Sequence, residues 1–184
     1  MDLYVILDAS TSRQEVFDRQ RLLAQALFER LPLVKDDDTV AVGLRSFTES
    51  QQLRLPLATG HSKAEVRKVL EGIRYVGGST RTAQAVEAAL RDIEEEKRTG
   101  AVQVAVLMND GRSQDEWNEV LRASKRLAAS GAERFVVALG TELDMRELEL
   151  YGTTSRIYRD QDTQRFIDDV ISLLGGDRCI ASPV

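Results

Sequence analysis

Short apolar runs of β-forming residues alternate with longer segments of helical periodicity along almost the whole of this 184-residue chain. The first run, residues 2–8 (DLYVILD), is nearly continuous in apolar residues, as expected for a strand covered on both faces. Residues 13–31 then place Val16, Leu23 and Leu27 on one helical stripe. Such alternation predicts an α/β doubly wound fold, in which a mostly parallel sheet carries helices on both faces.

The remaining segments continue this alternation. Further strands are expected at residues 39–47, 52–57, 101–108, 133–139 and 156–158, and further helices at about 62–72, 83–93, 113–130 and 166–174. The helix starts rest on two capping boxes, Ser62 with Glu65 and Ser113 with Glu116. Pro56 suits an antiparallel edge strand better than a central one, so we expect one such strand in the sheet.

Composition narrows the class of protein. Hydrophobic residues make up 42% and charged residues 30%, which is the balance of a globular protein. The length predicts one domain, which we place at residues 1–175, with residues 176–184 as a tail or the start of a linker. The net charge of −5 argues against nucleic acid as a partner, and the apolar runs are too short to insert in a membrane. A single Cys179 excludes an internal disulfide framework.

Oxygen-bearing side chains occur in three loops that this fold would bring together. Asp8, Ser10 and Ser12 follow the first strand, Thr80 follows a Gly-Gly pair, and Asp110 follows a later strand. Open parallel sheets bind ligands at the carboxyl ends of their strands, near the point where the strand order reverses. Carboxylates and hydroxyls without His or Cys suit Mg²⁺, Mn²⁺ or Ca²⁺. Because these groups do not fill an octahedral shell, water and one oxygen from outside, such as a carboxylate, would complete it.

This spaced set resembles the metal-ion-dependent adhesion site of von Willebrand factor type A domains. The pattern D-x-S-x-S at residues 8–12, the Thr after Gly-Gly and the D-G pair at residues 110–111 are all present, and the likeness covers nearly the whole chain. Residues 110–115 (DGRSQD) are similar to the matrix members of the family, the matrilins, collagen VI and the fibril-associated collagens. Residues 140–148 look like the family's loop after its fifth strand.

The resemblance implies a role for each matching residue. Ser10 and Ser12 would coordinate the metal directly, and Thr80 would do so in the ligand-binding state. Asp8 and Asp110 would act directly or through water. An acidic side chain of a protein partner, a matrix protein or a receptor, would complete the shell. The implied function is that of a secreted, non-enzymatic adhesion or matrix-assembly module using Mg²⁺, or Mn²⁺ or Ca²⁺ in its place.

Other functions fit the residues less well. An intracellular type A domain that acts as a scaffold or chaperone-associated module is the main alternative. A phosphotransferase of the haloacid-dehalogenase type needs a second Asp where this chain has Ser10, and the P-loop lysine is absent. The single His61 offers no credible catalytic triad. Integrin α-subunit inserted domains use a Glu after the last helix, and residues 175–184 contain none.

Several polar residues have two interpretations. Ser12 also forms a capping-box pattern with Glu15, and a single residue can both cap a helix and bind a metal. Thr82 is expected to cap a helix or to stand behind the metal ligands, and Asn109 to be an ordinary loop residue. The acidic residues 36–38 are expected to form a solvated loop. Cys179 would be a free thiol or would pair with a Cys preceding this segment in a longer protein.

Overall fold

A mixed sheet with β1 (Asp2–Asp8) at its middle forms the centre of the computed structural model, which describes residues 1–11, 13–34 and 38–175. The strand order of this six-stranded sheet, within the described residues, is β3-β2-β1-β4-β5-β6. The other strands are β2 (Ala41–Phe47), β3 (Gln51–Ala58), β4 (Gln103–Met108), β5 (Glu133–Val137) and β6 (Ile157–Tyr158). Among the strand pairs of the described chain, β2–β3 alone is antiparallel, which confirms the predicted sheet and its edge strand.

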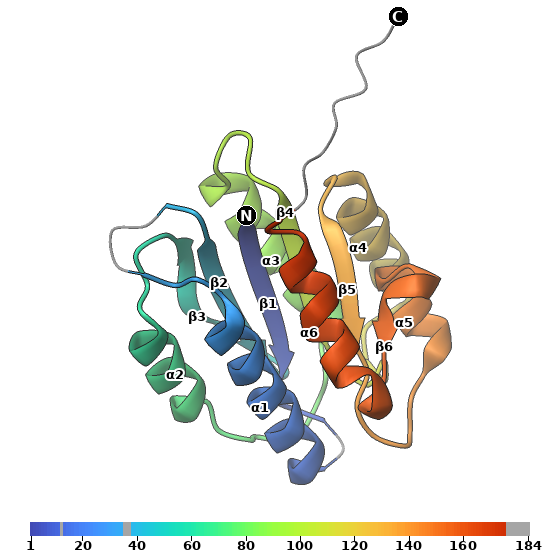
Figure 1. Ribbon diagram of the computed structural model, residues 1–184. Coiled ribbons are helices and arrows are strands. Elements are labelled where there is room, and N and C mark those ends of the chain that lie inside the picture. Colours follow the sequence, from blue (N-terminus) through green and yellow to red (C-terminus); the bar gives the residue numbers. More distant parts are fainter. Residues whose placement is uncertain (12, 35–37, 176–184) are drawn as a thin grey trace, which may run out of the picture.

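Helices cover both faces of the sheet, as predicted (Figure 1). One layer contains α1 (Gln14–Arg30), α2 (Lys63–Gly72) and α6 (Thr163–Ser172), and the other contains α3 (Thr82–Glu96), α4 (Trp117–Ala129) and α5 (Met145–Tyr151). Two short 3₁₀ helices, Thr154–Arg156 and Asp160–Asp162, flank β6. Among the described residues, no helix is both long enough and apolar enough to cross a membrane.

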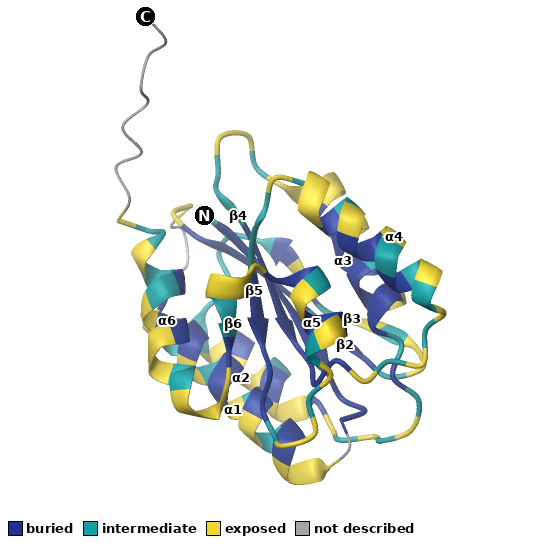
Figure 2. Cartoon of the chain, turned by 90° about the vertical axis from the view of Figure 1, so that its right-hand side faces the viewer, coloured by how far each residue is buried: buried dark blue, intermediate teal, exposed yellow. Residues whose placement is uncertain are grey.

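The apolar run of β1 is continuous because both of its faces are buried. Leu3, Val5 and Leu7 pack in the core under α1, α2 and α6, whereas Tyr4 and Ile6 pack in the core under α3, α4 and α5. Successive strand residues point to opposite faces, so two hydrophobic layers need apolar residues at every position. Figure 2 shows the strands as the buried interior between the helices.

Two local predictions are wrong. The capping box expected at Ser113–Glu116 does not form, because α4 begins at Trp117 and its N-cap, Glu116, makes no side-chain capping bond. Residues 140–148 are not all loop either, because Asp144 accepts hydrogen bonds from the backbone N–H groups of Arg146 and Glu147 and caps α5. The other predicted capping box, Ser62 with Glu65, is present and opens α2.

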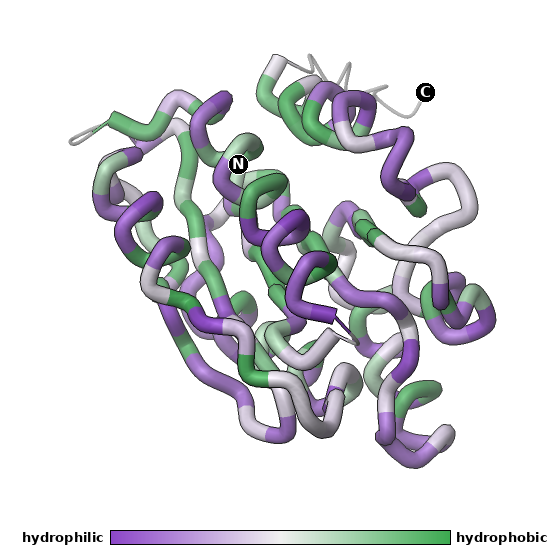
Figure 3. Tube along the Cα trace, turned by 90° about the horizontal axis from the view of Figure 1, so that it is seen from below, coloured by the Kyte–Doolittle hydropathy of each residue, from purple (hydrophilic) through white to green (hydrophobic). Residues whose placement is uncertain are grey.

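The carboxyl end of β1 marks the place where a ligand is expected. Since β2 pairs with one side of β1 and β4 with the other, the strand order reverses between β1 and β4. This end of the sheet lies at the bottom of Figure 1, and Figure 3 looks at the molecule from that side. Met1 and the end of α6 both lie at the opposite end of the sheet. The loops that follow β1 and β4 therefore face away from the chain ends.

Phe166 provides a test of how α6 is held on the sheet. It is fully buried, and its ring lies 5.4 Å from that of Tyr158 and 6.2 Å from that of Phe135. We expect Phe166→Ala to lower the free energy of unfolding by about 3–5 kcal/mol, because the cavity would be large and aromatic contacts would be lost. Urea denaturation measures the change. Leu22→Ala, at a 56% exposed position, is the control and should change it by less than about 0.5 kcal/mol.

Candidate metal site

Asp8 lies at the end of β1 and is fully buried. Its Oδ1 atom accepts hydrogen bonds from the backbone N–H of Ser10, at 2.8 Å, and from the Ser10 hydroxyl, at 2.6 Å. Its Oδ2 atom accepts a hydrogen bond from Nδ2 of Asn109, at 2.8 Å. Both oxygens are thus fixed by groups from the β1–α1 and β4–α4 loops, so the carboxylate has one defined orientation.

The loop before α3 brings Thr80 against Ser10. The two hydroxyl oxygens are 2.8 Å apart, and both residues are buried. Gly77, with a φ of +70°, donates its backbone N–H to the carbonyl of Ala9 and so joins this loop to the end of β1. From the other side, the backbone N–H of Gln114 donates to the Thr80 carbonyl at 2.9 Å. Thr80 is therefore held between the β1–α1 and β4–α4 loops.

Asp110 provides the second carboxylate at the same edge. It is 5% exposed, and its Oδ1 atom accepts a hydrogen bond from the backbone N–H of Arg112 at 3.1 Å. A hollow of about 250 Å³ opens over the cluster and is lined by Ser10, Gly78, Thr80, Asp110, Arg112 and Gln114. Of the five predicted ligands, Asp8, Ser10, Thr80 and Asp110 thus come together. Ser12 lies outside the described residues, as do residues 35–37 and Cys179.

The electrostatics of the cluster favour a cation. Burial and, to a smaller extent, the nearby charge of Asp110 raise the pKa of Asp8, whereas the hydrogen bonds from Ser10 and Asn109 lower it, and the net result is a pKa of about 7. Two carboxylates and two hydroxyls form an all-oxygen donor set, which fits Mg²⁺, Mn²⁺ or Ca²⁺. Across the described ranges, no three His, Cys, Asp or Glu side chains are grouped to hold a metal. A cation here would therefore depend on the hydroxyls as well as the carboxylates.

Asn109 is a site residue that the sequence prediction missed. It is fully buried, and its Nδ2 group donates to Thr82 Oγ1 at 3.2 Å as well as to Asp8. It is therefore a positioning residue rather than an ordinary loop residue. Thr82, the first residue of α3, lies behind the candidate ligands, as one of its two interpretations expected. Only its place directly after β4 and before Asp110 could have indicated the role of Asn109.

Helix α5 holds the loop that carries Asp110. The backbone N–H of Asp144 donates to the Asp110 carbonyl at 2.9 Å. Glu147, which is 4% exposed, accepts hydrogen bonds from the Ser113 hydroxyl at 2.9 Å and from its backbone N–H at 3.3 Å. Gly111 has a φ of +79°, and a side chain there would overlap the Asp144 carbonyl. Helix α5 and the residue before it thus hold the loop at Asp110 and Ser113. Position 111 requires glycine because of its positive φ and because a side chain there would have no room.

The fold and the cluster define a class of doubly wound α/β domain in which oxygen-bearing side chains gather at the switch point of the sheet. The chain belongs to the von Willebrand factor type A domain family, whose model matches residues 2–172. It is 28% identical to mouse Matrilin-1 over 153 residues, which are 80% of this chain and 30% of that protein. It is 28% identical to the human Collagen alpha-6(VI) chain over 170 residues, 85% of this chain and 7% of that protein.

Solved structures share the fold at lower sequence identity. Proximal thread matrix protein 1 from the mussel byssus superposes with a TM-score of 0.77 at 19% identity, over 94% of this chain and 46% of that one. The same mussel protein has been solved with zinc in its MIDAS motif, the metal-ion-dependent adhesion site. Manganese-loaded Plasmodium vivax TRAP protein gives a TM-score of 0.72 at 15% identity, over 95% of this chain and 71% of that one.

The buried carboxylates predict an unusual pH dependence of stability in EDTA. Burial raises the pKa values of Asp8 and Glu147 to about 7 in the folded state, so between pH 4 and 7 these two groups hold more protons in the folded chain than in the unfolded chain. The stabilisation is complete below about pH 4 and is lost as the pH rises through 7. We expect the free energy of unfolding to fall by a few kcal/mol, on the order of 1.4 kcal/mol per pKa unit, between pH 5 and 8.

Urea denaturation in EDTA at the two pH values measures this change. Glu147→Gln serves as the internal comparison, since it removes one of the two titrating groups and keeps the side-chain size. The decrease between pH 5 and 8 should be smaller in this variant. A free energy of unfolding that increased over this range in the wild-type domain would contradict the assignment.

Proposed function

We propose that this domain binds Mg²⁺, or Mn²⁺ or Ca²⁺ in its place, through Asp8, Ser10, Ser12, Thr80 and Asp110, and that the bound cation takes an acidic side chain of a protein partner. The observation that carries the proposal is the buried Asp8–Ser10–Thr80 hydrogen-bonded cluster, which lies beside Asp110 and opens into a hollow at the switch point. A fixed set of oxygens needs little rearrangement to receive a cation.

Each residue has a distinct part in this proposal. The hydroxyls of Ser10 and Thr80 face one another at 2.8 Å and would turn their lone pairs to the cation. Asp8 would hold the Ser10 hydroxyl and balance the positive charge from within the protein. Asp110, which lines the hollow, would contribute the carboxylate nearest the partner. The bound cation supplies an electrophile that accepts an oxygen of the partner's carboxylate.

The named relatives support an adhesive role in the extracellular matrix. Matrilin-1 and the collagen chains match this chain over a small part of their own length, as a module of a larger protein would. We therefore infer that this domain is a secreted, non-enzymatic adhesion or matrix-assembly module, with residues 1–175 as the domain and 176–184 as its tail. These relatives do not favour the alternative of an intracellular scaffold or chaperone-associated module. The partner would be a matrix protein or receptor.

Loss of Asp110 tests the cation site directly. We expect Asp110→Ala to weaken Mg²⁺ binding more than about tenfold, because changes even to groups behind the metal ligands cost 10- to 100-fold in affinity. Calorimetric titration of the EDTA-treated, dialysed domain measures the affinity. Asp168→Ala, which removes an exposed carboxylate on α6, is the matched control and should bind Mg²⁺ as the wild type does. Equal affinities in all three proteins would refute the site.

Binding to matrix proteins tests the adhesive role separately. The domain is titrated onto immobilised fibrillar collagen, laminin and fibronectin in Mg²⁺ and in EDTA. We expect saturable binding to at least one of them in Mg²⁺ and its loss in EDTA and in Asp110→Ala, because the cation would bridge the two proteins. Asp168→Ala should bind normally. Binding that survives both EDTA and Asp110→Ala, or none at all, would contradict a cation-bridged adhesive function.

A further inference from the structure

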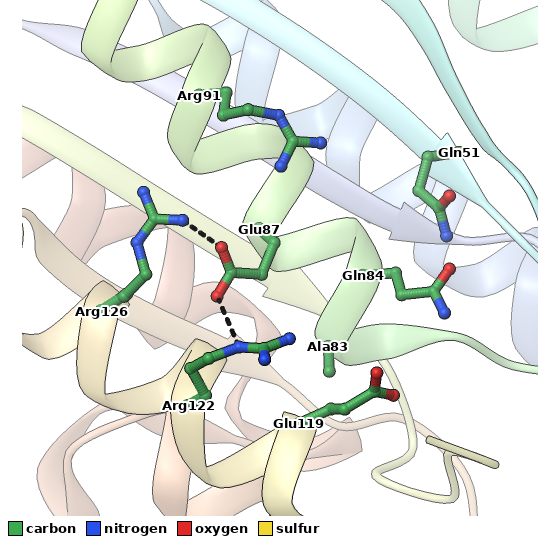
Figure 4. Close-up of a pocket in the computed structure, with 8 residues that line it drawn as sticks. All are labelled: Gln51, Ala83, Gln84, Glu87, Arg91, Glu119, Arg122 and Arg126. Carbon is green, nitrogen blue, oxygen red and sulfur yellow. Dashed lines mark hydrogen bonds and ion pairs between the residues drawn. The ribbon is translucent and has the colours of Figure 1, made fainter. Parts of the chain in front are cut away.

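A second polar pocket lies between α3 and α4 and shares no lining residue with the hollow over the candidate metal site (Figure 4). Its volume is about 390 Å³, which is within the range of small-ligand sites. Arginines from both helices line it, Arg91 from α3 and Arg122 and Arg126 from α4. Three arginines thus line one pocket of a chain whose net charge is −5.

Two of these guanidinium groups have donors to spare. Arg91 takes part in none of the ion pairs found among the described residues. Arg122 has a 66% exposed side chain, and its nearest carboxylate oxygen, Glu87 Oε1, is 3.9 Å from its Nε atom. Arg126, in contrast, is bound to Glu87 and, at 3.1 Å, to Glu94. A guanidinium has five N–H donors, so Arg91 and Arg122 each have N–H groups left to bind an anionic ligand in the pocket.

The remaining lining residues indicate what else the ligand carries. Glu119 lies at the α4 side of the pocket and Gln84 at the α3 side, and Gln51 contributes its amide from β3 (Figure 4). A carboxylate repels a bare anion but accepts hydrogen bonds from hydroxyl groups, and amides both donate and accept. The pocket therefore suits a ligand that combines an anionic group with hydroxyls.

A protein partner fits this pocket less well. Protein interfaces centre on buried aromatic or aliphatic anchors. The pocket is lined by polar and charged side chains together with Ala83, and none of the exposed large hydrophobic residues of the described chain, Leu22, Val34, Leu53 and Val76, is among its lining residues. We propose that the α3–α4 pocket binds an anionic saccharide unit, a sugar ring bearing sulfate or carboxylate, with Arg91 and Arg122 on the anionic group and Glu119 on the hydroxyls.

The test uses a heparin-derived hexasaccharide, its desulfated counterpart and inorganic sulfate, each titrated into the whole chain by calorimetry in EDTA. We expect the hexasaccharide to bind and the double variant Arg91→Gln/Arg122→Gln to bind it at least about tenfold more weakly, a loss of ~1.4 kcal/mol or more. Lys68→Gln/Arg74→Gln, which removes two exposed charges from and beside α2, is the charge-matched control and should bind as the wild type does. The substituted side chains are on the surface, and circular dichroism checks that each variant is folded.

Other outcomes overturn the proposal. Failure of the wild-type chain to bind the hexasaccharide would do so, and an equal loss in the two double variants would show attraction by general charge. Inorganic sulfate binding as tightly as the hexasaccharide would show that the sugar contributes nothing. Glu119→Gln should weaken hexasaccharide binding while strengthening sulfate binding, and the opposite result would contradict the role of Glu119. Loss of binding in Asp110→Ala would place the ligand at the candidate metal site instead.

Discussion

The carboxylate of Asp8, buried at the end of β1, determines how the loops around it are arranged. A buried charge without partners is costly, so the chain supplies Asp8 with hydrogen bonds from Ser10 and Asn109. Those bonds fix the start of the β1–α1 loop and the start of the β4–α4 loop. Thr80 then joins the cluster through the Ser10 hydroxyl. The arrangement of three distant segments thus follows from how one side chain is accommodated.

The Asp110 side of the cluster is held by α5 rather than by Asp8. The bond from Asp144 to the Asp110 carbonyl and the contacts of Glu147 with Ser113 connect this short helix to the β4–α4 loop. One carboxylate therefore belongs to the central strand and the other to a loop fixed by a peripheral helix. A movement of α5 would change the distance between the carboxylates without disturbing β1.

Sequence patterns predicted the sheet because the central strands are buried on both faces and are therefore mostly apolar, as in residues 3–7 of β1. They also indicated Asp8, Ser10, Thr80 and Asp110, because these residues lie in loops that the fold brings to one edge and because their spacing matches a known metal-site pattern. Glu147 could not be found this way, and for Asn109 only its place directly after β4 pointed to a role. Their roles depend on burial and on partners far along the chain, such as Ser113 for Glu147, 34 residues away. The capping box at Ser113 failed because α4 begins only at Trp117, with Glu116 as its N-cap.

Met1 and the end of α6 lie at the end of the sheet opposite the cluster. A longer chain that continued from both points would enter and leave the domain at the same end of the sheet. The domain would then project to one side of that longer chain. Its loops would then face neighbouring molecules instead of adjoining modules. Tension along such a chain would act first between the start of β1 and the end of α6, and the oxygen cluster would lie outside the path of the force.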